Sequence, residues 1–519
     1  MSSFEHTPLP RLSFFQLTGL MVLMLPVGLF FIGWFEPWIA VPFIAYCGIV
    51  LFRGLLTQDH IETSLHRPKL ILMLGVILIY LIVGGMVGWF PTHGDSFAMR
   101  QAMFLNLRDE AWPLILPNGR EMSYYLAGML PPAMLARIMP DNLQQWAVLL
   151  CSWLPIAISI ILLSRHFRRA SWLLLFILIA FQDPLSAFFR PTGTVSSGPG
   201  FMVEWLNHLW EYTGLDLRIL TSYYGNKTIG APIHNCIGAY NSTPYTLLAT
   251  ALLLTGREHR WLHPLVVALL VPVSPLSALA LFPVALYFYT HKRFGKQYVA
   301  PMLLELIAPT LIVILSAVYF LRAQRSDSTV SLDFLIHGKS FWPFYIRYIL
   351  GGSVLALPIM HMRRKDGLYR VTLLSMLFLP LLFVGSPPSA LYQGFNELTL
   401  KGTYIYALIL GVMWYEDWAH IRKGFRILAV AWLCASTGTY CLSQIRSFSP
   451  THQVADMWNG HLNHENRFLK QSIPETKEPL LPYVLIREGG ESEKHFPGNI
   501  LPHGTGCDYS TPPSPCAFP

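Results

Sequence analysis

The sequence has few charged residues, and this scarcity excludes an ordinary soluble domain. Only 13% of its 519 residues are charged, and 53% are apolar, whereas soluble domains carry about 25% charged residues. The chain also has no Gly-rich phosphate loop, no heptad run and no paired CxxC. These absences argue against a P-loop enzyme, a coiled coil and a structural zinc site. The composition therefore predicts a helical membrane protein.

The positive charge of the chain does not indicate a nucleic-acid partner. The net charge is +8, but the basic residues stand in short clusters between apolar runs, where Lys and Arg set membrane topology. We expect membrane lipids around the chain and no nucleic acid bound to it. The basic clusters are 53–69, 165–169, 257–260, 291–296, 363–370 and 420–426.

Long apolar runs predict an all-α, polytopic transmembrane bundle of about thirteen spans. No small-residue cleavage site follows the first run, so we expect it to be retained as a helix. Val273-Ser-Pro-Leu-Ser277 divides 261–290 into a hairpin or one kinked helix. The predicted spans are 17–35, 37–55, 69–89, 145–163, 171–189, 242–256, 261–272, 276–290, 298–320, 342–361, 370–385, 402–417 and 425–442.

The basic clusters fall on one side of the membrane if 261–290 is a hairpin and 123–139 does not cross. Pro131-Pro132 and Arg137 suit 123–139 to a short interfacial or re-entrant helix. The N-terminus is then cytoplasmic, and the tail and the longer loops lie on the opposite, exoplasmic face. The predicted organisation is two extra N-terminal helices (1–68), a transmembrane core (69–443) with exoplasmic loops 90–144, 190–241, 321–341 and 386–401, and a polar tail (444–519).

The first long loop gathers acidic residues next to a predicted span. Asp95 follows that span, and Asp109 and Glu110 end the short segment FAMRQAMFLNL. Met99, Ala102, Met103 and Leu107 give this segment an apolar stripe, so we expect an amphipathic helix lying on the membrane. Two carboxylates near one surface suit acid–base chemistry or a metal. The alternatives are a helix cap at Asp95 and a solvated charged turn at Asp109-Glu110.

The order of features in 70–165 resembles the first exoplasmic loop of GT-C glycosyltransferases, such as protein O-mannosyltransferases and the aminoarabinose transferase. It runs from an apolar helix through Gly94-Asp95, an amphipathic helix, an acid, Trp112-Pro113 and Tyr124-Tyr125 to a proline-broken helix ending in Arg137. The resemblance implies a GT-C-like fold with periplasmic interfacial helices, and a catalytic Asp at Asp95. The chain departs from the pattern in its extra N-terminal helices and in lacking a strict acidic pair, which leaves a Mg²⁺ or Mn²⁺ cofactor open.

Several further residues are candidates for binding the substrate. Arg100 and Lys401 are expected to hold a lipid phosphate. The segment 394–401 gathers polar groups at the mouth of a span, although Glu397 and Lys401 also fit a simple i,i+4 ion pair. Aromatic residues of the loop 190–241, Tyr240 among them, suit either sugar stacking or an interfacial belt. The candidate binding residues are Arg100, Tyr124, Tyr125, His234, Asn396, Glu397 and Lys401.

Two cysteines and two glycosylation sequons would be affected by the compartment in which they lie. Cys507 and Cys516 lie in the tail and are able to pair in an oxidising compartment. The triplets starting at Asn226 and Asn241 match the glycosylation sequon, which matters only in a secretory route. No metal site is predicted from the histidines and cysteines.

These patterns lead to one functional hypothesis with two alternatives. We expect a glycosyltransferase of the bacterial inner membrane that moves a sugar from a polyprenyl-phosphate donor to a glycan, lipid or protein acceptor on the exoplasmic face. Asp95 would activate the acceptor hydroxyl, with Asp109 or Glu110 assisting. The alternatives are a transporter or flippase for lipid-linked glycans, which predicts ionisable residues deep in several spans, and a non-catalytic assembly factor.

Overall fold

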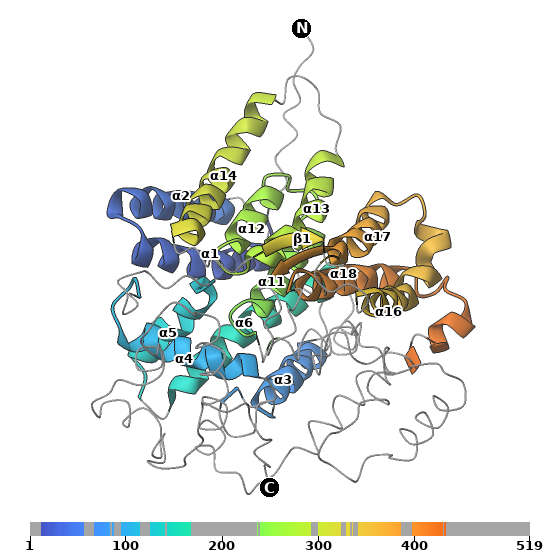
Figure 1. Ribbon diagram of the computed structural model, residues 1–519, viewed down its shortest axis with the longest axis horizontal. Helices are drawn as coiled ribbons and strands as arrows, with labels where there is room; N and C mark the ends of the chain where they lie inside the picture. The colour runs from blue at the N-terminus through green and yellow to red at the C-terminus, as the bar shows by residue number, and fades with distance from the viewer. Residues whose placement is uncertain are drawn as a thin grey trace, which may run out of the picture.

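A computed structural model of the chain was analysed (Figure 1). It describes residues 12–56, 67–83, 86–87, 95–114, 125–140, 143–167, 236, 239–291, 299–322, 329–332, 335, 341–385, 397–428 and 430–431.

The described part of the chain is helical, apart from one two-stranded ribbon, so the predicted all-α class is confirmed. The N-terminal elements are α1 (Phe14–Trp34), α2 (Pro37–Leu56), α3 (Arg67–Val83), α4 (Asp95–Asp109), η1 (Ala127–Met129), α5 (Leu130–Arg137) and α6 (Gln144–His166). The later elements are α11 (Thr243–Thr255), α12 (Leu262–Leu270), α13 (Pro275–His291), α14 (Val299–Arg322), β1 (Thr329–Leu332), α16 (Phe341–Arg363), α17 (Gly367–Phe378), η6 (Leu379–Leu381), β2 (Leu382–Gly385) and α18 (Glu397–Glu416).

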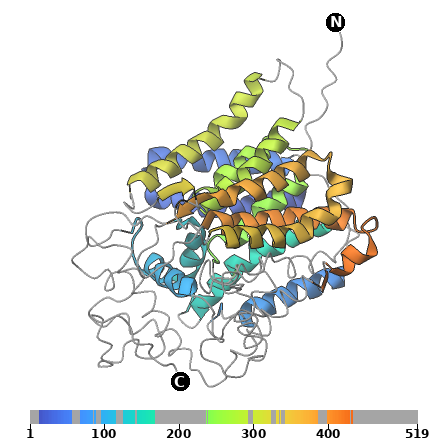
Figure 2. The ribbon, with the colours of Figure 1, turned by 45° about the vertical axis from the view of Figure 1, so that its right-hand side comes forward.

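Helix α11 forms the centre of the bundle. Every residue from Thr243 to Leu254 is buried, as expected of a helix that is apolar all round. Neighbours α6, α1, α12 and α18 pack around it, and the central helices run side by side in Figure 2. Its first residue, Thr243, therefore begins in the interior of the protein and not at its surface.

The segment 261–290 is a hairpin. Helices α12 and α13 pack against each other, and the ring of His263, at the start of α12, lies 5.4 Å from that of Phe288, near the end of α13. This antiparallel pairing confirms one of the two alternatives for this segment. However, α12 has nine residues, about 14 Å at 1.5 Å per residue, and a bilayer core is about 30 Å thick. It is too short for the full span predicted over 261–272.

Among the described residues, two helices, α1 and α6, are long and apolar enough to cross a membrane. Several others are apolar but shorter, including α11. The outer helices also expose large apolar side chains: Ile32 on α1 is 60% exposed, Trp38 on α2 74% and Ile71 on α3 68%. The exposed apolar faces are unlike the surface of a soluble protein. The count of about thirteen spans stays a prediction.

Two local predictions were wrong. The span predicted over 370–385 ends early because Pro380 interrupts the helix, and β2 then pairs antiparallel with β1, Val330 opposite Val384. Helix α18 begins at Glu397 and not at 402. Leu398 is fully buried, so the first turn is held by packing. Residues 397–401, expected at the end of the loop 386–401, thus lie inside a helix.

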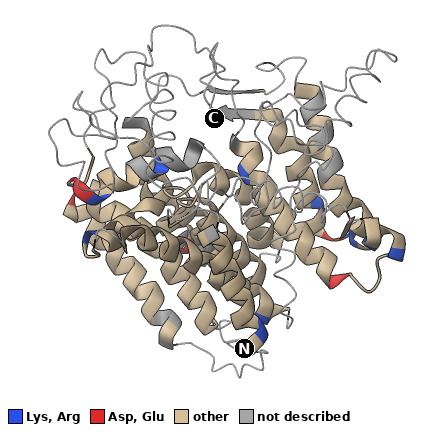
Figure 3. Cartoon of the chain, turned by 90° about the horizontal axis from the view of Figure 1, so that it is seen from below, with Lys and Arg blue, Asp and Glu red and all other residues tan. Residues whose placement is uncertain are grey.

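The helix ends that carry Arg165, Arg260 and Arg363 lie together at one end of the bundle. At this end, Arg165 of α6 covers the ring of Phe15, and Gln16 donates a 3.0 Å hydrogen bond to the Thr255 carbonyl at the end of α11. Arg260 covers the Tyr289 ring of α13. The few charged residues that are described stand mostly near helix ends (Figure 3).

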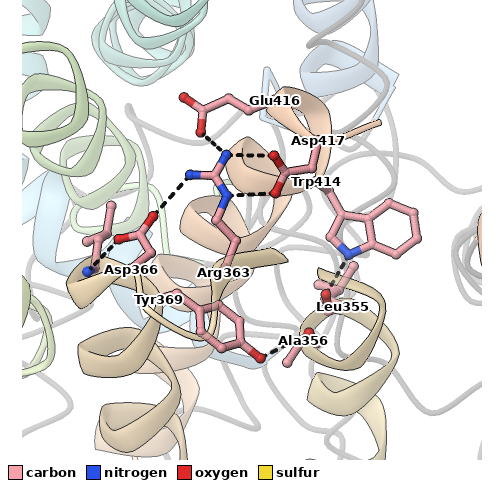
Figure 4. Close-up of polar contacts among 9 residues, drawn as sticks. Leu355, Ala356, Arg363, Asp366, Tyr369, Trp414, Glu416 and Asp417 are labelled. Atoms are coloured by element: carbon pink, nitrogen blue, oxygen red, sulfur yellow. Dashed lines mark hydrogen bonds and ion pairs between the residues drawn. The ribbon is translucent and has the colours of Figure 1, made fainter. Parts of the chain in front are cut away.

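The same end contains a cluster of ion pairs around one guanidinium, which we call the Arg363 cluster (Figure 4). Arg363 ends α16 and donates to both carboxylate oxygens of Asp417, at 2.6 and 2.9 Å. It also contacts Asp366, which caps α17, at 3.0 Å, and Glu416 at 2.9 Å. One arginine thus fixes the ends of α16, α17 and α18 relative to one another.

Candidate functional site

Lys401 is a buried cation at the opposite end of the bundle from the Arg363 cluster. It stands one turn into α18 and is only 3% exposed. Its ammonium donates a 2.8 Å hydrogen bond to the Ser242 hydroxyl, the residue before α11. The first turns of α18 and α11 therefore meet at this bond, and both helices direct the positive end of their dipole toward it.

Arg100 is a second buried cation, and it comes from α4. It lies on the same helical stripe as Met103, Phe104, Leu107 and Arg108, all buried. The spacing i, i+3, i+4, i+7, i+8 puts these residues on one face. This differs from the expected stripe, whose members Met99 and Ala102 have side chains outside the described part. The face of α4 that packs on the protein therefore carries two arginines.

Three consecutive residues connect the elements of this region. The Tyr240 hydroxyl donates to the Arg100 carbonyl at 2.8 Å. The Asn241 side-chain amide donates to the Tyr125 carbonyl at 3.4 Å, and the Ser242 hydroxyl accepts the hydrogen bond from the Lys401 ammonium. Residues 240–242 thus hold α4, the segment before η1 and α18 around the start of α11.

The two cations share neighbours. Tyr404, one turn after Lys401 and 1% exposed, lies close enough to Arg100 and to Cys236 for a direct electrostatic interaction with each. Cys236 in turn interacts with Lys401: burial raises the pKa of its thiol, and the lysine cation partly offsets that rise. We call the group of Arg100, Cys236, 240–243, Lys401 and Tyr404 the two-cation site.

Three polar atoms in the two-cation site have no hydrogen-bond partner within the described part of the chain. They are Asn241 Oδ1, Thr243 Oγ1 and the Tyr404 hydroxyl. Asn241 and Thr243 are fully buried. Buried polar atoms are normally paired, so each such atom in a native structure calls for an explanation. The burial also means that the sequon at Asn241 is inaccessible in the folded chain.

The predicted acids at the far end of α4 do not join this site. Asp109 lies 14 residues after Asp95 in one helix, a separation of about 21 Å along the axis, so the two residues stand at opposite ends of α4. The Asp109 carboxylate accepts a 2.7 Å hydrogen bond from Arg108, which also contacts Gln144. Glu110 lies beside it and its carbonyl accepts from Arg137 at 2.6 Å.

Arg137 caps the same end of α4. It donates to the carbonyls of Arg108 at 2.8 Å and Leu107 at 2.9 Å, and its guanidinium lies 4.8 Å from the Trp112 ring centroid. Trp112 in turn stacks on Trp34 of α1. A cation that binds the last carbonyls of a helix satisfies acceptors with no partner inside the helix. Trp112 and Arg137, two of the features that carry the family resemblance, thus hold the end of α4 in place.

The other predicted residues divide into three groups. Arg100, Lys401 and the Tyr125 carbonyl meet at the two-cation site. Asp95 and Glu397 begin α4 and α18, five residues before Arg100 and four before Lys401, but their side chains are outside the described part. Tyr124, His234, Asn396, the tail and most of the loop 190–241 also lie outside the described residues.

The described side chains do not fit a divalent cation. Among the described residues, no group of three or more His, Cys, Asp or Glu side chains is arranged to hold a metal. Two cations and neutral hydroxyl and amide groups make up most of the two-cation site, whereas Mg²⁺ and Mn²⁺ bind through carboxylates and water. We therefore derive no step that requires a metal.

Sequence patterns missed several residues of the site. Tyr404 stands within an apolar run that was read as a span, and 241–243 was read only as a sequon. Tyr240 was expected to be a stacking or belt residue, but it is 1% exposed and donates to Arg100. The available signal was a run of three polar residues, Asn241-Ser-Thr243, directly before an apolar helix.

No protein-family model, no curated protein and no solved structure matches this chain.

Proposed function

We propose that the chain is a polytopic membrane protein of the bacterial inner membrane, with its N-terminus cytoplasmic and its tail periplasmic. The support is the combination of α1 and α6, which have the length and apolarity of membrane spans, with outer helices that expose large apolar side chains. Basic residues concentrate on cytoplasmic ends. The Arg165, Arg260 and Arg363 end is then cytoplasmic, and the two-cation site is exoplasmic.

We further propose that the two-cation site binds the phosphate of a polyprenyl-phosphate sugar. The observation that carries this proposal is the burial of Arg100 and Lys401 together, 6% and 3% exposed, from helices far apart in the sequence. Buried cations of this kind suit the binding of an anion, because a phosphate is held by Arg and Lys through charge-assisted hydrogen bonds. The starts of α11 and α18 add their dipoles, which also favour an anion.

The proposed reaction is transfer of the sugar to a hydroxyl of a glycan, lipid or protein acceptor. Asp95 starts the helix that supplies Arg100, so its backbone lies about 7.5 Å along the axis from that residue. In the proposal, the Asp95 carboxylate takes the proton of the acceptor hydroxyl as its oxygen bonds to the sugar. The bond from sugar to phosphate breaks, and the leaving phosphate stays with Arg100 and Lys401. Asp109 and Glu110 have no part in this step.

The proposal is tested by comparing Asp95→Asn with Asp109→Asn, the matched change at the other end of α4. Each variant would replace the native chain in cells, and cell-envelope glycans would be measured by mass spectrometry together with the amount of folded protein. We expect Asp95→Asn to eliminate a glycan product that Asp109→Asn retains. Wild-type product from folded Asp95→Asn would refute the catalytic role. That result would instead fit a flippase, which needs no catalytic carboxylate at Asp95.

A further inference from the structure

The unpartnered atoms of the two-cation site give information about the ligand that the two cations alone do not. Asn241 Oδ1 is an acceptor, and the hydrogen bond from its amide nitrogen to the Tyr125 carbonyl fixes its orientation. A flipped amide would place two oxygens against each other. Oδ1 therefore requires a hydrogen-bond donor, and it has none in the described part of the chain.

A phosphate cannot supply that donor. A phosphodiester, or a phosphomonoester above its second pKa of about 6, offers acceptor oxygens only, so it suits Arg100 and Lys401 but leaves Asn241 Oδ1 unpaired. The Tyr404 and Thr243 hydroxyls are able to donate as well as accept. The site thus combines two cations with an acceptor and two hydroxyl groups, a pattern complementary to an anion that carries hydroxyl groups beside it.

We infer that Asn241, Thr243 and Tyr404 are specificity-determining residues that select a phosphate bearing a hydroxylated headgroup over a bare lipid phosphate. The inference rests on the proposed phosphate site. Asn241 Oδ1 accepts from a sugar hydroxyl, and the Thr243 and Tyr404 hydroxyls complete the contacts. With a bare lipid phosphate these atoms remain unpaired, and a site built to bind a hydroxyl discriminates strongly against a ligand that lacks it.

The position of these residues supports the inference. Asn241 and Thr243 flank Ser242, which binds the Lys401 ammonium, and Tyr404 stands one turn beyond Lys401 and interacts with Arg100. All three residues are at most 1% exposed. The unpaired atoms therefore lie among the residues that contact the cations and not at a separate part of the core.

The experiment measures binding of two probes to the full chain in detergent. Farnesyl phosphate carries the anion alone, and its glucosyl and mannosyl phosphodiesters, which differ at the 2-hydroxyl, carry the headgroup. For the wild type we expect at least one diester to bind about tenfold or more tightly than farnesyl phosphate. Asn241→Leu, Thr243→Val and Tyr404→Phe should each reduce that preference and leave farnesyl phosphate binding within about twofold.

Thr250→Val is the matched control for Thr243→Val. Thr250 lies on the same face of α11 and is as deeply buried, but its hydroxyl already donates to the Thr246 carbonyl at 2.8 Å, so the preference should not change. If Asn241→Leu fails to fold, Thr243→Val and Tyr404→Phe carry the test. Equal binding of all probes by the wild type would overturn this inference and leave the phosphate site standing. Failure of every probe to bind would overturn both.

Discussion

The ammonium of Lys401 donates a 2.8 Å hydrogen bond to the hydroxyl of Ser242, a residue 159 positions earlier in the chain. This bond joins the first turn of α18 to the start of the central helix α11, in a part of the protein that is nearly closed to solvent. This bond gives Lys401 a fixed position at the start of α11, one turn before Tyr404 in α18.

The close contact of Gly128 with residue 241 should make that glycine essential. A methyl group at Gly128 would lie 1.7 Å from the Asn241 carbonyl oxygen, a backbone atom that cannot rotate away. We expect Gly128→Ala to lower the free energy of unfolding by about 1–3 kcal/mol, as overpacking does. Thermal unfolding in detergent would measure this loss.

Gly75→Ala is the control for that substitution. Nothing lies within 4 Å of the methyl group that it adds to α3, so we expect no loss and a gain of up to about 1 kcal/mol from helix propensity. Equal stability of Gly128→Ala and Gly75→Ala would contradict the packing of 127–129 against residue 241.

Arg137 should stabilise the end of α4 through the several hydrogen bonds that its guanidinium group donates. It donates to the carbonyls of Leu107, Arg108 and Glu110 at 2.9, 2.8 and 2.6 Å. A lysine keeps the charge but cannot reproduce this set of bonds, so Arg137→Lys should cost about 1–2 kcal/mol of unfolding free energy. The exposed Arg422 provides the control: Arg422→Lys should leave the melting temperature unchanged. A similar null result for Arg137→Lys would contradict the capping role.

The Arg363 cluster should stabilise its end of the bundle. Arg363→Gln leaves Asp366, Glu416 and Asp417 close together without their shared cation. The group is half-buried, so we expect a loss of about 1–3 kcal/mol, between the values for exposed and buried ion pairs. The neighbouring Arg364 is exposed, and Arg364→Gln should have little effect in the same unfolding measurement. Similar losses for both variants would argue against the cluster.

Cys236 should be an unreactive thiol. Burial raises its pKa, and Lys401 only partly offsets the rise, so the thiolate that reacts with iodoacetamide is scarce. Between pH 7 and 9, labelling of the native Cys236 peptide should stay low, whereas in denatured protein it should rise with pH. The pKa of Cys236 is higher in the folded state than in the unfolded state, so the folded chain holds the thiol proton more tightly. The stability that this difference gives is fully present below the unfolded-state pKa and decreases as pH rises above it. Equal labelling of native and denatured chains would contradict the buried position.

The sequence predicted helices better than it predicted the site. Apolar runs located α1, α2 and α6 because each helix is a long apolar segment that is either buried or in contact with lipid, and a run of apolar residues is enough to identify it. The start of α18 was misplaced because Glu397 and Lys401 look like loop residues, although Leu398 between them is buried. Local pattern contains no information on a partner 159 residues away, so the Lys401–Ser242 bond was beyond its reach.

The lack of information on distant partners also explains why the acidic residues and Arg100 were only partly placed by the sequence. The pattern of α4 favoured grouping Asp95 with Asp109, whereas one rigid helix keeps them about 21 Å apart. Arg100 was selected as a candidate for the phosphate, but its burial depends on residues distant in the sequence, such as Tyr240, whose hydroxyl donates to its carbonyl. Tyr404 has no local signal, because isolated polar residues in apolar runs are common.

The central claim is that Arg100 and Lys401 bind one anion together. A double-mutant cycle with Arg100→Gln and Lys401→Gln, measured as binding of farnesyl phosphate to the purified full chain, tests it most directly. We predict that each single change weakens binding about tenfold or more and that the double variant loses clearly less than the product of the two. Binding as tight as the wild type in both folded single variants would contradict the claim.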